Sequence, residues 1–232
     1  MATNDSKSTT DRRRFLGTIA TGAAAMSLAA FSPIAAHAEN NFIPGTDDDP
    51  DAWFNKVKGT HRIVFDVVGP NEIMPFAWPR VFLLTNAATK TPESDCGVVV
   101  VLRHNGIPFA FENRIWEKYK FGEFFKFNDP KTKQPSTRNP FWKPAKGDFS
   151  IPGFGEVQIG INELQESGVM FCVCHAAMTV LSTVVAGQMN MDAKEVFNDW
   201  TSGLLPGIQV VPSGVWAVGR AQEHGCKYCY AG

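Results

Sequence analysis

The sequence has almost no excess charge and lacks the motifs of several common enzyme classes. Its 232 residues carry 22 basic and 23 acidic side chains, a formal net charge of −1, and no basic cluster in the part expected to fold, which argues against nucleic-acid binding. It has no P-loop, dinucleotide fingerprint or nucleophile elbow, which argues against kinases, nicotinamide enzymes and serine hydrolases. Beyond the N-terminal segment, no apolar run is long enough to span a membrane.

The N-terminal segment has the pattern of an export signal. Three arginines, Arg12–Arg14, precede a run of small, weakly apolar residues and the motif Ala36-His37-Ala38. This is typical of a twin-arginine signal peptide with an A-x-A cleavage site. The alternative is an uncleaved membrane anchor, but residues 15–36 are rich in poor membrane formers and contain Ser32-Pro33. We expect residues 1–38 to engage the twin-arginine machinery and be removed, leaving a periplasmic protein without a permanent membrane anchor.

After a polar arm at residues 39–60, apolar strands and helices alternate, and there is no internal repeat. The valine run Val98–Val101 predicts a strand buried on both faces, as in a parallel sheet. The predicted strands are residues 61–68, 96–104, 169–174, 207–211 and 226–230, and the main predicted helices are 74–90, 161–166, 175–188, 192–202 and 215–224. This pattern predicts a single three-layer α/β domain over residues 61–232, Rossmann- or flavodoxin-like, with a mostly parallel sheet of about five strands.

Two segments interrupt the alternation. Residues 107–127 are dense in aromatic side chains, which predicts core packing or a subunit interface, with a ligand-stacking wall as the alternative. Within them, Asn113 is expected to cap a short helix that reaches Tyr119. Residues 128–155 are rich in proline and lysine without a period, which predicts a long inserted loop; its aromatic part suggests that it covers something.

Chemistry is most expected where the strand 169–174 runs directly into a helix. This junction places the Cys174 thiol at the carboxyl edge of the sheet, near helical N–H groups whose dipole favours a thiolate. His175 adjoins it, and His104 and Ser213 end neighbouring strands at the same edge. With the strand order 2-1-3-4-5, Cys174 borders the ligand crevice. The alternatives are an inert buried thiol, a structural histidine and a helix cap.

A second set of residues could bind a metal. Its members are thiols and imidazoles that suit zinc or copper: Cys172, Cys174, His175, His224, Cys226 and Cys229. Cys172 and Cys174 point to one face of a strand about 6.6 Å apart, which disfavours a disulfide between them. Cys226 and Cys229 are also held apart if they lie in a strand, whereas a turn after Gly225 would allow a disulfide or a metal pair. A structural disulfide or free thiols remain the simplest alternatives.

The order of these motifs resembles the DsrE/DsrF-like family. The shared features are Gly168-Val-Met-Phe-Cys-Val-Cys174, the apolar helix that follows, Val211-Pro-Ser-Gly-Val215, and the helix end Ala221-Gln-Glu-His-Gly225. The resemblance covers roughly residues 61–230. It implies a small α/β domain that forms homo-oligomers, in which one cysteine, here Cys174, carries a persulfide. The export signal, the 128–155 insertion and three extra thiols depart from the family pattern.

The sequence therefore predicts a periplasmic persulfide carrier or relay acting through Cys174. The expected partners are a sulfur donor or acceptor protein, or a small thiol, and no resident cofactor is expected. One alternative is a periplasmic Cys/His metal-binding protein with zinc or copper. Another is an oligomeric binding module without catalysis, in which residues 109–127 form the interface or pocket.

Overall fold

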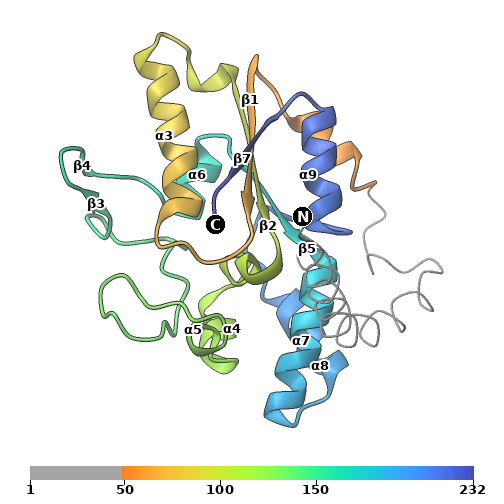
Figure 1. Ribbon diagram of the computed structural model, residues 1–232. Coiled ribbons are helices and arrows are strands. Elements are labelled where there is room, and N and C mark those ends of the chain that lie inside the picture. The colour runs from red at the N-terminus through yellow and green to blue at the C-terminus, as the bar shows by residue number, and fades with distance from the viewer. Residues whose placement is uncertain (1–48) are drawn as a thin grey trace, which may run out of the picture. The chain divides into compact units, whose positions relative to one another are not determined.

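The computed structural model describes residues 49–232 as a parallel sheet covered by helices on both faces (Figure 1). The predicted signal peptide, residues 1–38, and most of the arm lie outside the described residues. The sheet order is β6-β5-β2-β1-β7, and every neighbouring pair of strands is parallel. The predicted three-layer α/β class with five strands is thus confirmed. The strands are β1 (His61–Val67), β2 (Cys96–Leu102), β5 (Met170–Cys174), β6 (Ile208–Val211) and β7 (Lys227–Tyr230).

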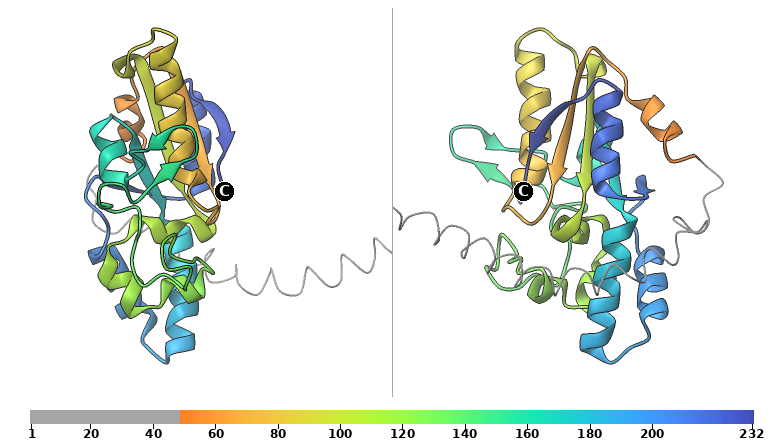
Figure 2. Two further views of the ribbon diagram at one scale, coloured as in Figure 1. Left: turned by 90° about the vertical axis from the view of Figure 1, so that its left-hand side faces the viewer. Right: turned by 45° about the vertical axis from the view of Figure 1, so that its right-hand side comes forward.

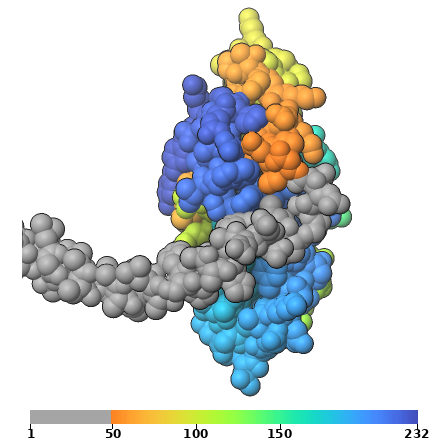
Figure 3. Space-filling view, turned by 90° about the vertical axis from the view of Figure 1, so that its right-hand side faces the viewer, coloured from red at the N-terminus to blue at the C-terminus, as the bar shows by residue number. Residues whose placement is uncertain are grey.

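Helices form the outer layers and a group at the carboxyl end of the sheet (Figures 1 and 2). One face carries α3 (Met74–Ala88) and α6 (Ile161–Glu166), and the other carries α9 (Gly214–Glu223). The short helix η1 (Ala52–Lys56) lies beside α9, as Figure 3 shows from that side. The remaining elements are η2 (Glu93–Asp95), η3 (His104–Ala110), α4 (Asn113–Lys118), α5 (Phe121–Phe124), the hairpin β3 (Ser150–Ile151) and β4 (Gly155–Glu156), α7 (His175–Met189) and α8 (Ala193–Ser202).

The sheet separates two hydrophobic cores because successive residues of a strand point to opposite faces. In β2, Val98 and Val100 enter the α3-side core, whereas Val99 and Val101 enter the α9-side core. All four valines are buried, as the valine run predicted. The α9-side core consists of Trp53, Phe54, Val57, Val64, Val99, Val101, Cys172, Val211, Ala217, Ala221 and Cys226. Trp53 and Phe54 thus dock the end of the N-terminal arm onto the sheet.

The strand order differs from the order 2-1-3-4-5 considered from the sequence. Numbered along the chain, the five strands run 4-3-2-1-5 across the sheet. The reversal therefore falls between β1 and β7, and β5 is not next to it. Alternation of strands and helices does not determine on which side each new strand is added. Here β2, β5 and β6 extend the sheet on one side of β1, and α9 then carries the chain to the other side.

The aromatic segment is core and not a free surface. Phe109, Phe111, Trp116 and Phe121 are fully buried, and the Trp116 indole donates a hydrogen bond to the Pro108 carbonyl at 2.9 Å. The expected helix exists as α4, but its N-cap is Glu112 and not Asn113. The Asn113 side chain instead accepts a hydrogen bond from the Asn139 backbone N–H at 2.9 Å, which fastens the inserted loop to α4.

The inserted loop, residues 128–155, covers part of the α3-side core. Phe141 is fully buried, with its ring centroid 4.3 Å from that of Phe76 and 5.1 Å from that of Phe149. The buried Asn139 side chain donates to the backbone carbonyls of Phe109 and Phe111. A sequence without helical or strand period is therefore held in place by a few buried anchors.

The helix α7 differs from expectation. Its sequence is apolar on nearly all sides, which is typical of a buried helix, but Val180 and Val184 are each 44% exposed and Met189 is 39% exposed. The helix extends past the carboxyl end of the sheet, where α8 covers one side of it (Figure 1). Among residues 49–232, no helix is both long and apolar enough to cross a membrane.

Candidate functional site

Cys174 lies where β5 ends and α7 begins. It is the N-cap residue of α7, and its Sγ accepts a hydrogen bond from the Ala177 backbone N–H at 3.2 Å. The residue is 6% exposed and packs with the α3-side core. A sulfur atom thus occupies the position where serine, threonine or aspartate usually caps a helix. The predicted strand-to-helix junction, with a thiol facing the helical N–H groups, is present.

Arg103 is the neighbour of Cys174 on the adjoining strand. The register pairs Leu102 of β2 with Val173 of β5, so the next residue of each strand, Arg103 and Cys174, lie side by side at the sheet edge. Neighbouring parallel strands are about 4.8 Å apart. The stem of Arg103 packs against the first residue of α9, because a Cβ at Gly214 would lie only 2.3 Å from the Arg103 Cβ.

Asp66 and Tyr228 hold the Arg103 guanidinium in place. Arg103 Nε donates to Asp66 Oδ1 at 2.6 Å, and Nη2 donates to Oδ2 at 2.8 Å. The Tyr228 hydroxyl donates to the same Oδ2 at 2.9 Å. Asp66 is 2% exposed, whereas the Arg103 side chain is 26% exposed. The carboxylate is thus a buried anchor for a guanidinium that still reaches solvent.

These four residues form a row across four adjacent strands, which we call the edge row: Tyr228 of β7, Asp66 of β1, and Arg103 and Cys174 at the ends of β2 and β5. Its electrostatics follow from these contacts. The hydrogen bond to Asp66 raises the pKa of Arg103. Burial, together with the bond to Asp66, raises the pKa of Tyr228, which keeps its hydroxyl a donor. The row therefore presents a permanent cation at the same edge of the sheet as the thiol.

The other predicted site residues lie near Cys174 in different roles. Ser213 follows the adjacent strand β6 and caps α9, because its Oγ accepts a hydrogen bond from the Trp216 N–H at 3.2 Å. His175 packs its ring 5.3 Å from the Phe197 ring, and burial lowers its pKa. His104 is not in the strand as predicted: it begins η3 with φ 50° and is exposed. The sheet edge thus brings Ser213 and His104 to either side of Cys174, with the Ser213 hydroxyl engaged as a cap.

The predicted metal ligands do not converge. β5, with Cys172 and Cys174, is separated from β7, with Cys229, by β2 and β1. Three strand spacings amount to about 14 Å, whereas zinc binds sulfur at about 2.3 Å. Among residues 49–232, no three His, Cys, Asp or Glu side chains are grouped around a possible metal position. All five cysteines are free thiols.

The remaining thiols differ in burial. Cys172 is fully buried in the α9-side core, whereas Cys174 packs with the α3-side core, so the prediction that the two thiols share one face is wrong. Burial raises the pKa of Cys172 far above the ordinary range. Burial also raises the pKa of Cys226 to about 11. Cys226 directly precedes β7 and Cys229 lies within it, so the C-x-x-C is extended and not a turn. This arrangement keeps the two sulfurs from forming a bond with each other.

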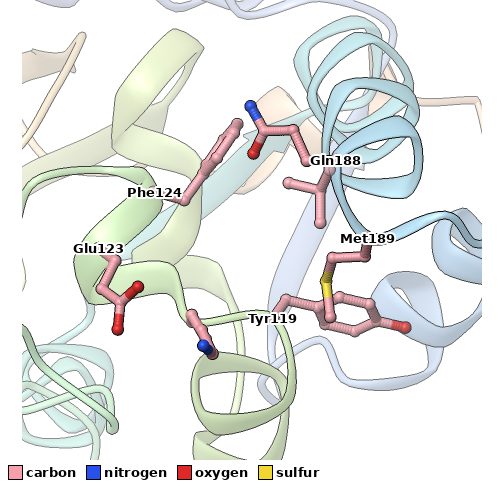
Figure 4. Close-up of a pocket in the computed structure, with 7 residues that line it drawn as sticks. Tyr119, Glu123, Phe124, Gln188 and Met189 are labelled. Atoms are coloured by element: carbon pink, nitrogen blue, oxygen red, sulfur yellow. The ribbon is translucent and has the colours of Figure 1, made fainter.

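A surface hollow of about 550 Å³ lies between α5 and α7 (Figure 4). Phe124 and Gln188 face each other across it, and its lining is Tyr119, Lys120, Glu123, Phe124, Val185, Gln188 and Met189. Two further hollows, of about 520 and 540 Å³, lie near the amino end of β5. None of the three is lined by Cys174. Of the aromatic segment, Tyr119 and Phe124 reach the hollow at α5.

Asp66 and Arg103 were not identified from the sequence. The signals were present: Asp66 is a charged residue inside an otherwise apolar strand, and Arg103 immediately follows the valine-rich strand. A charge within a buried strand requires a partner. The expected and the observed strand orders both place these two strands side by side, so this pair was within reach of the sequence.

Comparison with known proteins leaves the family open. No family model matches the chain, and no curated protein matches it. A solved structure of a protein of unknown function from Methanobacterium thermoautotrophicum is similar to this chain at 20% identity. The alignment covers 73% of this chain and 98% of that one, with a TM-score of 0.34. The fold class rests on the sheet of this chain itself, and membership of the DsrE/DsrF-like family stays a prediction.

Proposed function

We propose that this protein is a periplasmic sulfur carrier in which Cys174 accepts and passes on a single sulfane sulfur atom. The observation that supports this most strongly is the position of the Cys174 sulfur, which caps α7 beside Arg103. A helix N-terminus and a neighbouring cation both favour the anionic form of a thiol and of a persulfide. The periplasmic location follows from the twin-arginine pattern in the sequence.

The proposed step exchanges sulfur without net oxidation. The Cys174 thiolate attacks the terminal sulfur of a small persulfide, R–S–SH. A new S–S bond forms on Cys174 while the S–S bond of the donor breaks. The electron pair of that bond leaves on R–S⁻, which takes up the proton released by Cys174. The products are Cys174 persulfide and the thiol R–SH, and the reverse exchange delivers the sulfur to an acceptor thiol.

These residues fit a protein that carries sulfur better than an enzyme that completes a catalytic cycle by itself. The imidazole of His175 packs against Phe197, and the hydroxyl of Ser213 caps α9. Neither contact arranges an acid or a base for a second chemical step. The metal-binding alternative loses support because Cys229 lies across the sheet from Cys172 and Cys174. A binding module at residues 109–127 would have to use the hollow beside Phe124, since most of that segment is core.

Sulfur loading of the purified mature protein tests the proposal. The protein is incubated with a small persulfide, passed through a desalting column, and weighed intact by mass spectrometry. We expect a gain of one sulfur atom that disappears on reduction and is absent from Cys174→Ser. Cys172→Ser is the matched control, because its thiol lies two residues away in the same strand and is fully buried. Loading of Cys174→Ser at the wild-type level would overturn the proposal.

A further inference from the structure

The edge row contains a cation whose hydrogen-bonding capacity is only partly used. Asp66 engages the side of the guanidinium formed by Nε and Nη2. A guanidinium carries five N–H groups in a fixed planar fork. The end formed by Nη1 and the second Nη2 hydrogen makes no hydrogen bond to any residue within 49–232, and the side chain is 26% exposed. Arg103 can therefore bind a second anion without releasing Asp66.

Burying Asp66 to hold Arg103 costs desolvation free energy, which suggests that the pair has a use other than stability. Asp66 is 2% exposed, so its charge has lost nearly all contact with water. Buried ion pairs often add no stability compared with apolar residues of the same shape. What this pair does supply is orientation, since bidentate contact with Asp66 and the packing of Gly214 against its stem both restrict Arg103.

The position of this cation relates it to the thiol. Arg103 is opposite Cys174 in the register of β2 and β5, with backbones about 4.8 Å apart. The guanidinium is turned toward Asp66 on β1 and Cys174 lies on the other neighbour of β2, so a donor that reaches both groups must extend across the end of β2. Since Cys174 is 6% exposed, the donor must also be slender near its terminal sulfur.

We propose that Arg103, oriented by Asp66 and Tyr228, is the specificity-determining residue of the Cys174 site and selects anionic sulfur donors. This inference rests on the proposed function and names its substrate class: small persulfides that carry a sulfonate or carboxylate group. The free end of the Arg103 fork can donate two parallel hydrogen bonds to two oxygens of a carboxylate or a sulfonate. The sulfur exchange itself is the one already described for Cys174.

Three donors of similar size and different charge test the selection. They are the persulfides of mercaptoethanesulfonate, mercaptoethanol and mercaptoethylamine, whose end groups are anionic, neutral and cationic. The rate of one-sulfur loading is followed by intact mass. We expect the anionic donor to load the wild-type protein about tenfold faster than the neutral one, in line with a hydrogen bond to a charged group at a partly exposed site, and the cationic donor to be slowest.

Variants of Arg103 distinguish direct binding of the donor's anionic group from long-range electrostatic attraction. Arg103→Gln should abolish the preference, and the double variant Asp66→Asn with Arg103→Gln should do the same without leaving a buried carboxylate unpaired. Lys227→Gln is the matched control, because it removes an exposed positive charge from β7 without touching the edge row. A direct contact should also keep most of the preference in about 0.5 M salt, where long-range attraction is screened.

The outcomes distinguish the two proposals. Loading of wild-type protein at equal rates by all three donors would overturn the role of Arg103 and leave Cys174 as a sulfur carrier. A preference that survives in the folded double variant, or that Lys227→Gln also abolishes, would overturn it equally. Failure of every donor to load the wild-type protein would overturn the proposed function, and this inference with it.

Discussion

Asp66 accepts two parallel hydrogen bonds from Arg103, of 2.6 and 2.8 Å, between the adjacent strands β1 and β2. The pair lies at the carboxyl edge of a parallel sheet, where α/β proteins commonly bind ligands. Tyr228 extends it to β7, and the strand register extends it to Cys174 of β5. Four strands thus contribute to the edge row. Its cysteine, Cys174, is also the N-cap of α7.

The buried ion pair makes a direct prediction about stability. Arg103→Gln leaves the buried Asp66 carboxylate with only Tyr228 as a side-chain partner, so we expect a loss of about 3 kcal/mol in the free energy of unfolding. Asp66→Asn and Arg103→Gln together should cost less than the sum of the single changes, because the residues are coupled. Urea denaturation measures all three. A loss for Arg103→Gln no greater than that for Lys227→Gln, expected within about 0.5 kcal/mol, would contradict this account.

The hydrogen bonds of Asp199 predict that the protein loses stability in acid. Burial alone would raise its pKa, but hydrogen bonds from Lys118, Tyr119 and Arg114 outweigh burial and lower the pKa to about 2. Since the folded pKa lies below the unfolded value of about 3.9, the stabilisation is complete above about pH 4 and is lost as the pH falls toward 2. Because Lys118 and Arg114 are about half exposed, we expect about 1 kcal/mol.

Asp199→Asn should remove this part of the pH dependence. Its free energy of unfolding should change less than that of the wild type between about pH 4 and pH 2, while the two curves should run parallel above pH 5. Denaturation at a series of pH values makes the comparison. Glu223→Gln is a control, since it removes an exposed carboxylate paired with Arg220 elsewhere in the protein. Equal acid sensitivity of wild type and Asp199→Asn would refute the assignment.

The cysteines should differ in their reaction with alkylating reagents. Cys172 is fully buried and burial raises its pKa, so it should remain unlabelled by iodoacetamide in the folded protein. Cys96 and Cys229 are partly exposed and should be labelled faster than Cys172, although burial raises the pKa of each. Peptide mapping after a timed reaction reports each site. Labelling of Cys172 at the rate of Cys229 under native conditions would show that the α9-side core is more open than described.

We expect the packing of the inserted loop against the core to depend on the buried ring of Phe141. Phe141→Ala removes a side chain that is fully buried against Phe76 and Phe149, and we expect it to cost about 3–5 kcal/mol. Phe154→Ala lies in the same segment and is the matched control, because Phe154 is 79% exposed. It should change stability by less than about 0.5 kcal/mol. Thermal unfolding compares the two, and equal effects would mean that the loop does not rest on the core as described.

The sequence predicted the elements better than their arrangement. The valine run of β2 and the thiol between β5 and α7 are local signals, and the structure has both. The strand order could not be predicted, because alternation alone does not say on which side a strand is added. That order moved the reversal away from Cys174 to the β1–β7 boundary. It also placed β2, and with it Arg103, next to β5, where the expected order put β1.

The exposure of α7 also could not be predicted from its local sequence. The composition of α7 predicted a buried helix, yet Val180 and Val184 face solvent because α7 extends past the sheet and is covered mainly by α8. His104 shows the same limit on a smaller scale. It was assigned to the end of a strand, but the strand ends at Leu102 and the chain turns at His104 with a positive φ.

The most direct test of the central claim is a peptide-resolved mass measurement on protein isolated from periplasm without reductant and supplied with excess small persulfide. We expect one additional sulfur atom on the peptide that contains Cys172 and Cys174, removed by reduction and absent from Cys174→Ser, with none on the peptides of Cys96, Cys226 or Cys229. Sulfur on one of those other peptides, or none on the Cys174 peptide under these conditions, would contradict the assignment of Cys174 as the carrier.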